Sequence, residues 1–131
     1  MSELVQLFVN GEAMSGRSIH NAIANAKFLG DVATAPRYRF FSVRDEFPGL
    51  FLVEQNGVSV PGELYEVDYA TLRDRLLPEE PIELELSIIE LADGAGALSL
   101  HLRKTALGAP GVTDISELGG WRAYRALRDK G

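Results

Sequence analysis

The sequence predicts one α+β domain, residues 1–131, in which a small mixed or antiparallel β-sheet curls towards a barrel and helices pack around it. This length suits one hydrophobic core and leaves little room for a second domain. Segments with strand character follow one another with few helical segments between them. Strands in this order are joined mainly by turns, which favours an antiparallel or mixed sheet over a doubly wound nucleotide-binding fold.

The chain is expected to open with a strand, a loop and a helix. Apolar side chains alternate over residues 5–9, which is typical of a strand. Glycines in residues 10–16 permit a tight loop. Ser18 is the expected N-cap of the first helix, because apolar side chains then recur at helical spacing, as at Ile19 and Ile23.

Strands and turns fill the middle of the chain. Residues 37–43 are rich in aromatic side chains and predict a strand. The pair Pro48-Gly49 is expected to turn the chain into a strand over residues 50–54. The pair Asn56-Gly57 is a hairpin signal, and it leads into a strand over residues 58–67.

A short helix and two more strands are expected next. Asp68 can cap a helix over residues 69–77, whose apolar side chains share one face. Polar and apolar side chains alternate over residues 83–88 and predict a half-buried strand. The alternation slips at Ile89, which predicts a bulge or a bend. After a glycine-rich turn, alternation over residues 98–102 predicts another strand.

The last element is expected to be a helix over residues 114–127 with a break near Gly119-Gly120. Trp121 is expected to pack at the base of the barrel, as a large aromatic side chain can. Arg122 either takes part in the same packing or pairs with Asp114. Both interpretations make this region structural.

Composition excludes several classes of partner. The formal net charge of −6 argues against nucleic acid and an anionic membrane surface, because both are bound mainly through Lys and Arg. Thirteen Lys and Arg residues still permit a local cationic pocket for a small anion. The apolar runs are too short to span a bilayer, and no signal-peptide pattern opens the chain. With no cysteine, thiol chemistry is excluded, and a cytoplasmic location is expected.

Common cofactor and catalytic motifs are missing from the sequence. It contains no phosphate-binding loop, no dinucleotide-binding glycine motif and no nucleophile elbow. His20 and His101 are the only histidines, which excludes a zinc site built from several histidines. We therefore expect no cofactor and no metal, and chemistry that rests on carboxylates, backbone donors, Arg and Tyr.

Three blocks of sequence carry a family resemblance. Residues 9–21 are similar to a Val-Gly-x-His-Leu-x-Gly-Met-Pro-Leu-Asn segment, with both glycines in register. Residues 26–39 and 48–50 are similar to Ala-Arg-Phe-Leu, Thr-Ala-Pro-x-Tyr-Arg and Pro-Gly-Leu. Residues 114–124 match Asp-Ile-Thr-x-Phe-Gly-Gly-Trp-Arg-x-Tyr almost position for position. Together the blocks resemble the C-terminal domain of allophanate hydrolase, and we expect a stand-alone form of it.

The resemblance implies a γ-glutamylcyclotransferase-like barrel with a pocket at the loop after the first strand. In cyclotransferases that loop offers N–H groups to a substrate carboxylate, and a glutamate across the cavity shuttles the proton. In allophanate hydrolase the domain follows an amidase domain and helps to break down a carboxylated intermediate into carbon dioxide and ammonia. The implied ligand is a small carboxylate-containing compound, and the implied partner is an amidase or allophanate hydrolase subunit.

The sequence departs from the family at positions that matter for activity. The family histidine of the first block falls at Ala13, and a family glutamate late in the penultimate strand falls at Arg103. The segment Asn10-Gly11-Glu12 also replaces the Tyr-Gly-Ser of true cyclotransferases. The fold can therefore be carried over from the family, whereas the activity cannot.

The candidate substrate-binding loop consists of Asn10, Gly11, Glu12, Ala13 and Met14. Successive N–H groups in a glycine turn ahead of a helix attract carboxylates. The alternative is a plain strand-to-helix turn. The Glu12 carboxylate opposes the first interpretation, because it would repel an anionic substrate.

Glu80 and then Glu79 are the candidate proton carriers, because the resemblance places the cyclotransferase glutamate in a comparable position. Burial would raise the carboxyl pKa towards neutrality and suit it to acid–base chemistry. The alternative is a solvated polar face. His20 is the third candidate catalytic residue, either replacing the lost family histidine in space or lying on the surface.

Tyr38 and Arg39 are the remaining candidate substrate-binding residues. They are neighbours in one strand and point to opposite faces, so only one of them can face the interior. An inward Tyr38 would orient a substrate with its hydroxyl. An inward Arg39 would need a carboxylate partner, such as the substrate.

Three functions are consistent with these residues. The first is an enzyme that decarboxylates or hydrolyses a small carboxylated amide in urea or amide nitrogen metabolism. The second is a non-catalytic partner that stabilises a separate amidase, which predicts a large exposed apolar patch. The third is a γ-glutamylcyclotransferase that releases 5-oxoproline.

Overall fold

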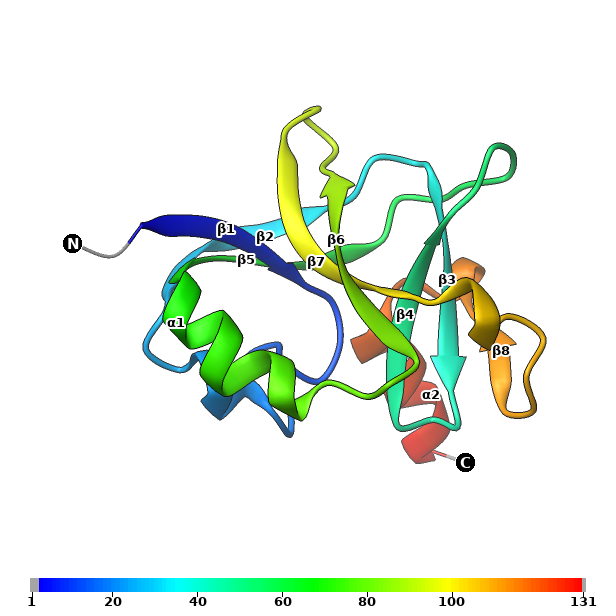
Figure 1. The fold of residues 1–131 in the computed structure, drawn as a ribbon. Helices are drawn as coiled ribbons and strands as arrows, with labels where there is room; N and C mark the ends of the chain where they lie inside the picture. Colours follow the sequence, from blue (N-terminus) through cyan, green and yellow to red (C-terminus); the bar gives the residue numbers. More distant parts are fainter. Residues whose placement is uncertain (1–2, 131) are drawn as a thin grey trace.

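The computed structural model describes residues 3–130, which form a curled half-barrel around one mixed sheet (Figure 1). The strands are β1 (Leu4–Val9), β2 (Lys27–Ala33), β3 (Tyr38–Val43), β4 (Phe47–Leu52), β5 (Pro61–Asp68), β6 (Leu84–Glu90), β7 (Gly96–Leu102) and β8 (Val112–Asp114). The helical segments are η1 (His20–Ile23), α1 (Tyr69–Thr71), η2 (Leu72–Leu76), η3 (Leu77–Glu79), η4 (Lys104–Ala106), η5 (Ser116–Leu118) and α2 (Trp121–Lys130).

Pairing along the sheet follows the order β2-β5-β1-β7-β4-β3-β8, and β6 pairs with β7. Most neighbouring strands are antiparallel, but β7 runs parallel to both β1 and β4. The mixed, curled sheet with helices at its periphery confirms the predicted fold class. Its topology brings β1, β4 and β7 together, which positions the cavity described below.

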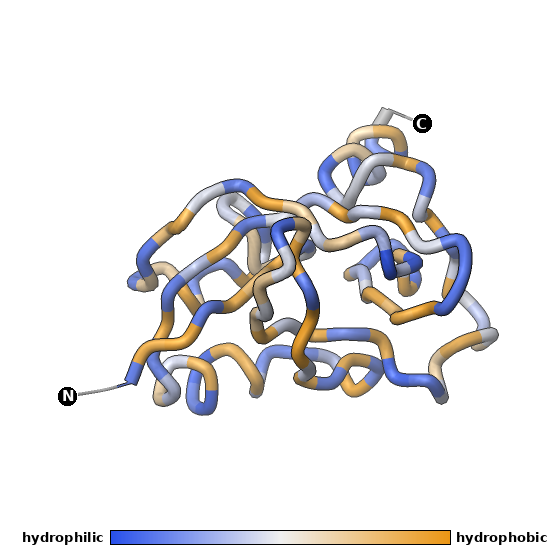
Figure 2. The backbone as a smooth tube through the Cα atoms, turned by 90° about the horizontal axis from the view of Figure 1, so that it is seen from above, coloured by the Kyte–Doolittle hydropathy of each residue, from blue (hydrophilic) through white to orange (hydrophobic). Residues whose placement is uncertain are grey.

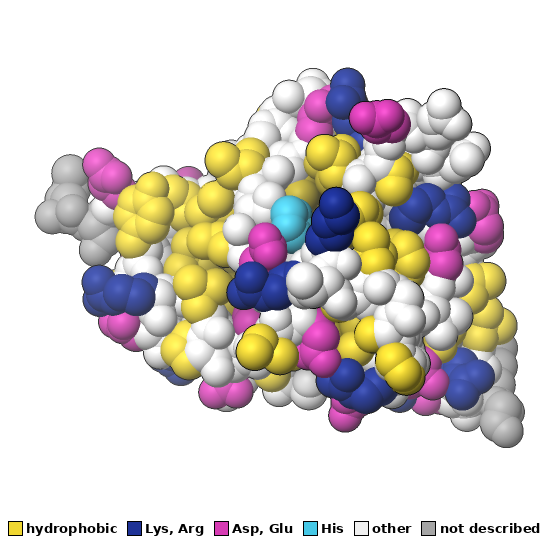
Figure 3. Space-filling view, turned by 45° about the vertical axis from the view of Figure 1, so that its right-hand side comes forward, with side chains coloured by type: hydrophobic (Ala, Val, Ile, Leu, Met, Phe, Trp, Pro, Cys, Tyr) yellow, Lys and Arg dark blue, Asp and Glu magenta, His cyan; other side chains and the backbone are white. Residues whose placement is uncertain are grey.

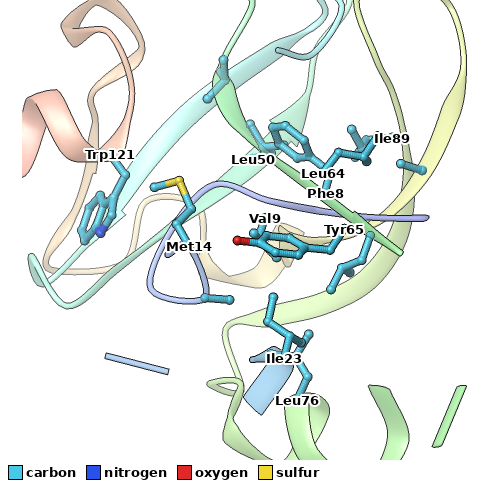
Figure 4. Close-up of a cluster of buried hydrophobic side chains, with 14 of the residues drawn as sticks. Phe8, Val9, Met14, Ile23, Leu50, Leu64, Tyr65, Leu76, Ile89 and Trp121 are labelled. Atoms are coloured by element: carbon cyan, nitrogen blue, oxygen red, sulfur yellow. The ribbon is translucent and has the colours of Figure 1, made fainter. Parts of the chain in front are cut away.

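Two clusters of buried side chains stabilise the half-barrel. The larger cluster occupies both faces of β1 and β5, because successive residues of a strand point to opposite faces. In Figure 4, Phe8 and Leu64 lie on one side of β1, and Tyr65 and Ile23 lie on the other. The smaller cluster joins the β3–β4 hairpin to β6 and β7 around Leu102.

Hydrophobic and hydrophilic stretches alternate along most of the backbone, as Figure 2 shows. This pattern fits strands that alternate between the core and solvent.

Among residues 3–130, no helix is both long and apolar enough to cross a membrane.

The segment from α1 to η3 confirms the predicted short helix. Asp68 caps it, with Oδ1 accepting a 2.7 Å hydrogen bond from the Thr71 N–H. Leu72 and Leu76 are buried beneath it, as their shared face predicts. The segment ends at η3, so Glu80 begins the chain that leads into β6.

The predicted first helix is wrong beyond a single turn. Only η1 is helical, and Ile19, not Ser18, occupies its N-cap position. Residues 27–33 form β2, which pairs with β5 and shifts register between Phe28 and Gly30. Backbone pairing with the edge of β5 overrides the local helical spacing, because sheet context outweighs intrinsic propensity.

The turn predicted at Pro48-Gly49 is also wrong. The chain turns instead over residues 44–46, where Arg44 and Asp45 both have positive φ (53° and 60°) and the Glu46 N–H donates to the Val43 carbonyl (2.9 Å). Pro48 and Gly49 lie inside β4. A Cβ on Gly49 would stand 2.9 Å from Leu84 Cδ2, so the glycine permits close packing rather than a turn.

The hairpin predicted at Asn56-Gly57 is not formed. Asn56 does adopt a positive φ (64°) and turns the chain. However, β5 pairs with β1 and β2 rather than with β4, and Val58 makes only an isolated bridge to Tyr38. The turn depends on neighbouring residues, whereas the partners of β5 depend on pairing with strands that are distant in sequence.

β6 differs from the predicted half-buried strand. Leu86 and Ile88 are exposed (42% and 73%), whereas Leu84 and Ile89 are buried. The register with β7 runs without a shift along the whole strand, so of the predicted bulge or bend the bulge is absent. Leu84 packs in the smaller core cluster and Ile89 in the larger one. The slip in the pattern therefore marks the passage of the strand from one cluster to the other.

The C-terminal region breaks at the predicted glycines. Gly119-Gly120 has positive φ at both residues (83° and 104°) and separates η5 from α2. Trp121 is 1% exposed at the start of α2 and packs in the larger cluster. Arg122 lies 3.2 Å from Glu63, so the predicted pairing with Asp114 is wrong.

Candidate functional site

A cavity of about 150 Å³ opens beside the loop that follows β1. Its wall comes mainly from residues 8–13, 46–48, 79–81 and 99–100, which lie far apart in the sequence. An apolar cavity of about 150 Å³ is large enough to bind benzene. The space therefore suits a molecule of a few heavy atoms.

A glycine allows the first loop to lie against β4. A Cβ on Gly11 would stand 2.5 Å from Pro48 Cδ, so a larger residue would push the two segments apart. The Met14 N–H donates to the Gly11 carbonyl (3.1 Å) and closes the turn. Within residues 3–130, the N–H groups of Gly11, Glu12 and Ala13 donate no hydrogen bond. Successive free N–H groups are what the predicted anion cradle requires.

Asn10 lines the same cavity and has an unused donor. The residue is 7% exposed, and its Nδ2 has no hydrogen-bond partner in the described part of the chain. An unpaired buried donor costs about 1–3 kcal/mol. Such a group is explained when a ligand supplies the missing acceptor.

Glu80 and Glu79 also lie in the wall of this cavity. Glu79 is exposed, whereas Glu80 is half-buried. Burial raises the pKa of Glu80 from 4.5 to about 7, because the carboxylate loses hydration. The Glu80 N–H donates to the Leu77 carbonyl (3.1 Å), which fixes the backbone at the end of η3. A carboxyl group with this pKa can either donate or accept a proton near neutral pH.

The Glu12 carboxylate is occupied by neighbours in the chain. It accepts hydrogen bonds from the Ser18 hydroxyl (2.7 Å), Arg17 Nε (3.1 Å) and Trp121 Nε1 (2.5 Å). Burial acts to raise the pKa of Glu12, but the hydrogen bonds from Trp121 and Ser18 and the charge of Arg17 outweigh it and hold the pKa below its usual value. Glu12 thus fixes the loop, and Arg17 counters the charge that would repel an anionic ligand.

Two predicted residues, Met14 at the end of the loop and His20 beside it, do not line the cavity. His20 Nδ1 lies 2.9 Å from the Ala13 carbonyl oxygen, and its ring centroid is 5.7 Å from that of Tyr65. Met14 is 3% exposed and belongs to the larger core cluster. These contacts place both side chains as supports of the loop.

Tyr38 and Arg39 point to opposite faces of β3, as predicted, and both lie outside the cavity. Tyr38 faces inward, and its hydroxyl accepts a hydrogen bond from the Glu90 N–H (2.9 Å). Arg39 faces outward and pairs with Asp114 and Glu117, at 3.0 Å from each. The carboxylate partners of Arg39 therefore come from its own chain, and they tie β3 to β8 and η5.

Other lining residues had no sequence signal. Ser99 is 1% exposed, and its hydroxyl donates to the Phe8 carbonyl (2.9 Å), which ties β7 to β1. Phe47 and Pro48 lie in β4, where the sequence predicted a turn at Pro48-Gly49. Long-range strand pairing brings these residues together, and such pairing cannot be predicted from the local spacing of residue types. Among residues 3–130, no group of three or more His, Cys, Asp or Glu side chains is placed to hold a metal ion.

Comparison with known proteins points to one family. A family model described as the allophanate hydrolase C-terminal domain matches residues 5–126. The urea amidolyase of Saccharomyces cerevisiae is 28% identical over 136 residues, a match that takes in 98% of this chain and 7% of that protein. The solved structure of a uropathogenic E. coli-specific protein superimposes with a TM-score of 0.87 at 31% identity, covering 95% of this chain and 97% of that one.

Larger proteins contain the same fold as one part. Allophanate hydrolase from Kluyveromyces lactis superimposes with a TM-score of 0.89 at 25% identity, over 96% of this chain and 22% of that one. The chain thus spans less than a quarter of the length of the allophanate hydrolase and urea amidolyase that it matches. A structure described as gamma-glutamyl cyclotransferase has a TM-score of 0.58 at 13% identity, over 77% of this chain, which shows a shared fold.

Proposed function

The chain belongs to the allophanate hydrolase C-terminal domain family, and on this basis we propose that it binds a small carboxylated amide beside the first loop and assists its breakdown by proton transfer. The observation that carries the proposal is the position of Glu80, whose pKa is about 7, in the same cavity as unpaired hydrogen-bond donors. The family supports the class of compound, since its larger relatives are named urea amidolyase and allophanate hydrolase.

The donors around the cavity suit an acid or acyl group. The N–H groups of Gly11, Glu12 and Ala13 can bind one carboxylate or carbonyl oxygen, and Asn10 Nδ2 can bind a second. Phe8 and other apolar residues supply the rest of the wall. A compact molecule with both acid and amide groups would satisfy these donors and fill the volume.

Glu80 supplies the proton that an N-carboxylated amide needs in order to lose carbon dioxide. The C–N bond breaks with its electron pair on nitrogen, the nitrogen takes the Glu80 proton, and the carboxylate leaves as neutral carbon dioxide. An apolar wall favours this step, because it solvates a carboxylate poorly and a neutral product well. The Glu80 carboxylate then regains a proton from solvent.

Thermal denaturation in the presence of small ligands tests the proposal. The panel consists of malonate-like dicarboxylates, allophanate analogues and γ-glutamyl amino acids. A ligand at a hundred times its Kd stabilises a protein by about 2.7 kcal/mol, which raises Tm measurably. We expect Asn10→Leu and Glu80→Gln to abolish the shift. The control Glu54→Gln, which changes an exposed carboxylate outside the cavity, should keep it.

The other outcomes separate the alternatives. A shift that persists in both cavity variants would place the ligand elsewhere and contradict the proposal. Release of 5-oxoproline from a γ-glutamyl amino acid would favour a cyclotransferase. An inert protein that forms a stable complex with an amidase would favour a non-catalytic partner, a role that Ala13 at the family histidine position supports.

A further inference from the structure

β6 presents a free backbone edge. Of the described strands it pairs only with β7. The Arg103 N–H donates to the Glu83 carbonyl (2.8 Å), so odd-numbered residues of this segment direct their backbone groups towards β7. Even-numbered residues direct theirs away from it, and at Leu86 and Ile88 these outward groups have no backbone partner within residues 3–130.

The two ends of this edge are already occupied. At Glu90 the outward N–H donates to the Tyr38 hydroxyl (2.9 Å), and the carbonyl accepts from the Ala35 N–H (2.9 Å). At Leu84 the N–H donates to the Pro81 carbonyl (3.1 Å). Among residues 3–130, the outward N–H groups of β6 that remain without a backbone partner are therefore those of Leu86 and Ile88, on either side of Ser87.

The same stretch is apolar and lacks the usual protection of an edge strand. Leu86 and Ile88 are 42% and 73% exposed, and Ile82, just before the strand, is 83% exposed. Figure 3 shows one face of the molecule, on which hydrophobic side chains lie next to acidic and basic ones. Edge strands are commonly protected by lysine, proline or a bulge. β6 contains neither lysine nor proline, and its register is unbroken.

The acidic side chains of β6 are neutralised by its own chain. Glu85 lies 3.2 Å from Arg103, and Glu90 lies 3.4 Å from Arg37. β6 can therefore pair with a second strand without placing an unpaired carboxylate in the interface. The pairing must only avoid setting a carboxylate of one strand opposite a carboxylate of the other.

We propose that β6 pairs with β6 of a second copy of this chain, antiparallel and about a two-fold axis at Ser87. This register places Leu86 of each copy opposite Ile88 of the other, so that the free N–H and carbonyl groups of these two residues exchange hydrogen bonds. It sets Glu85 against Ile89 and Glu90 against Leu84, and no two carboxylates face each other. If the two-fold axis lay at Leu86 or Ile88 instead, free groups of one copy would face Leu84 or Glu90 of the other. The N–H groups of those two residues already have partners within their own chain.

A second copy fits better than an unrelated strand because the edge is complementary to itself. Both the hydrogen-bonding residues and the apolar side chains are symmetric about Ser87. The resulting dimer joins two half-barrels into one continuous sheet and leaves the Glu80 cavity as part of each copy. Its formation is independent of the proposed function.

Cysteine cross-linking tests the register, since the chain has no cysteine of its own. In this dimer the two Ser87 residues form a directly opposed pair whose Cα atoms are about 4.5 Å apart, a distance that a disulfide bridges. We expect Ser87→Cys to yield a covalent dimer under mild oxidation at least tenfold faster than Ala70→Cys, an exposed control on α1. Equal rates for the two variants would overturn the proposal.

Sedimentation equilibrium tests the association itself. We expect the wild-type protein to form dimers and Ile88→Lys to raise the dimer Kd at least tenfold. The exposure of Ile88 keeps that substitution compatible with the fold, which circular dichroism checks. Leu127→Lys removes an exposed apolar side chain of α2 and should leave the Kd unchanged. A wild-type protein that stays monomeric, or whose β6 edge binds only an unrelated polypeptide, would overturn the proposal.

Discussion

The raised pKa that suits Glu80 to proton transfer also lowers the stability of the fold. Its pKa is raised from 4.5 to about 7 because burial disfavours the carboxylate. Between these pH values the folded state keeps a proton that the unfolded state has lost. The free energy of unfolding therefore falls as the pH rises through this window, and it stays lower above it. The cost above neutrality is on the order of 3 kcal/mol.

We expect Glu80→Gln to remove this cost. The variant should exceed the wild type in free energy of unfolding by about 2–3 kcal/mol above neutral pH. The two proteins should be equally stable near pH 4, where the wild-type carboxyl is largely protonated in both states. Urea denaturation across this range measures the difference, with Glu54→Gln as an exposed control that should follow the wild type. Parallel profiles for wild type and Glu80→Gln would contradict a buried carboxyl.

The family resemblance and the residue types together predicted part of the cavity. The glycine loop and Glu80 were predicted from the family pattern, and the structure brings them together. Tyr38, Arg39 and His20 were candidates because of their chemistry, yet they lie outside the cavity. Side-chain type does not reveal which face of a strand is inward or whether a partner is near. The unpaired Asn10 donor likewise depends on burial, which the folded chain alone creates.

Among the helices and strands, those specified by neighbouring residues were predicted correctly, whereas those that depend on distant partners were not. Asp68 caps its helix through the Thr71 N–H, a contact within one turn of the chain. β7 forms where the alternation of apolar side chains predicted a strand, with Leu102 buried and Leu98 and Leu100 half-buried. By contrast, β2 exists because β5 offers an edge, and the β3–β4 turn falls at Arg44 and Asp45, of which only Asp45 is a typical turn residue. Elements defined by distant partners leave little trace in local sequence.

The contact between the first loop and β4 predicts the effect of Gly11→Ala. The new Cβ would stand 2.5 Å from Pro48 Cδ and 2.7 Å from Cγ, so the loop must move. We expect a loss of about 1–3 kcal/mol in the free energy of unfolding, as for overpacking. Ligand affinity should also fall, because the displaced loop carries the cradle. Guanidinium denaturation measures the stability.

A matched control for Gly11→Ala is Gly96→Ala in β7. A Cβ at Gly96 would meet Ile88 Cγ2 at 3.6 Å, an ordinary contact. This variant should lose little stability and keep ligand binding. If Gly11→Ala behaved like Gly96→Ala, the close approach of the loop to β4 would not be needed for the site.

At the scale of the whole molecule, α2 connects the C-terminal region to the first loop. Trp121 Nε1 donates to the Glu12 carboxylate, 109 positions away in sequence. Arg122 donates to the Ser15 carbonyl (2.6 Å) and pairs with Glu63 (3.2 Å). The loop that lines the cavity is therefore held by the last helix as well as by β4. We infer that the stability of α2 and the geometry of the cavity are coupled.

A double-mutant cycle between Trp121→Phe and Glu12→Gln tests this coupling. Phenylalanine keeps an aromatic ring in the core but removes the N–H donor, and a hydrogen bond to a charged group contributes about 1.5–3 kcal/mol. The folded pKa of Glu12 lies below 4.5, so the interaction is fully present above that pH and is lost as the pH falls through the folded pKa. We expect a coupling energy of about 1–3 kcal/mol at neutral pH, decreasing towards zero in strong acid. Urea denaturation of the four proteins at both pH values measures it, and a coupling that does not change with pH would show that Trp121 acts on the loop through packing alone.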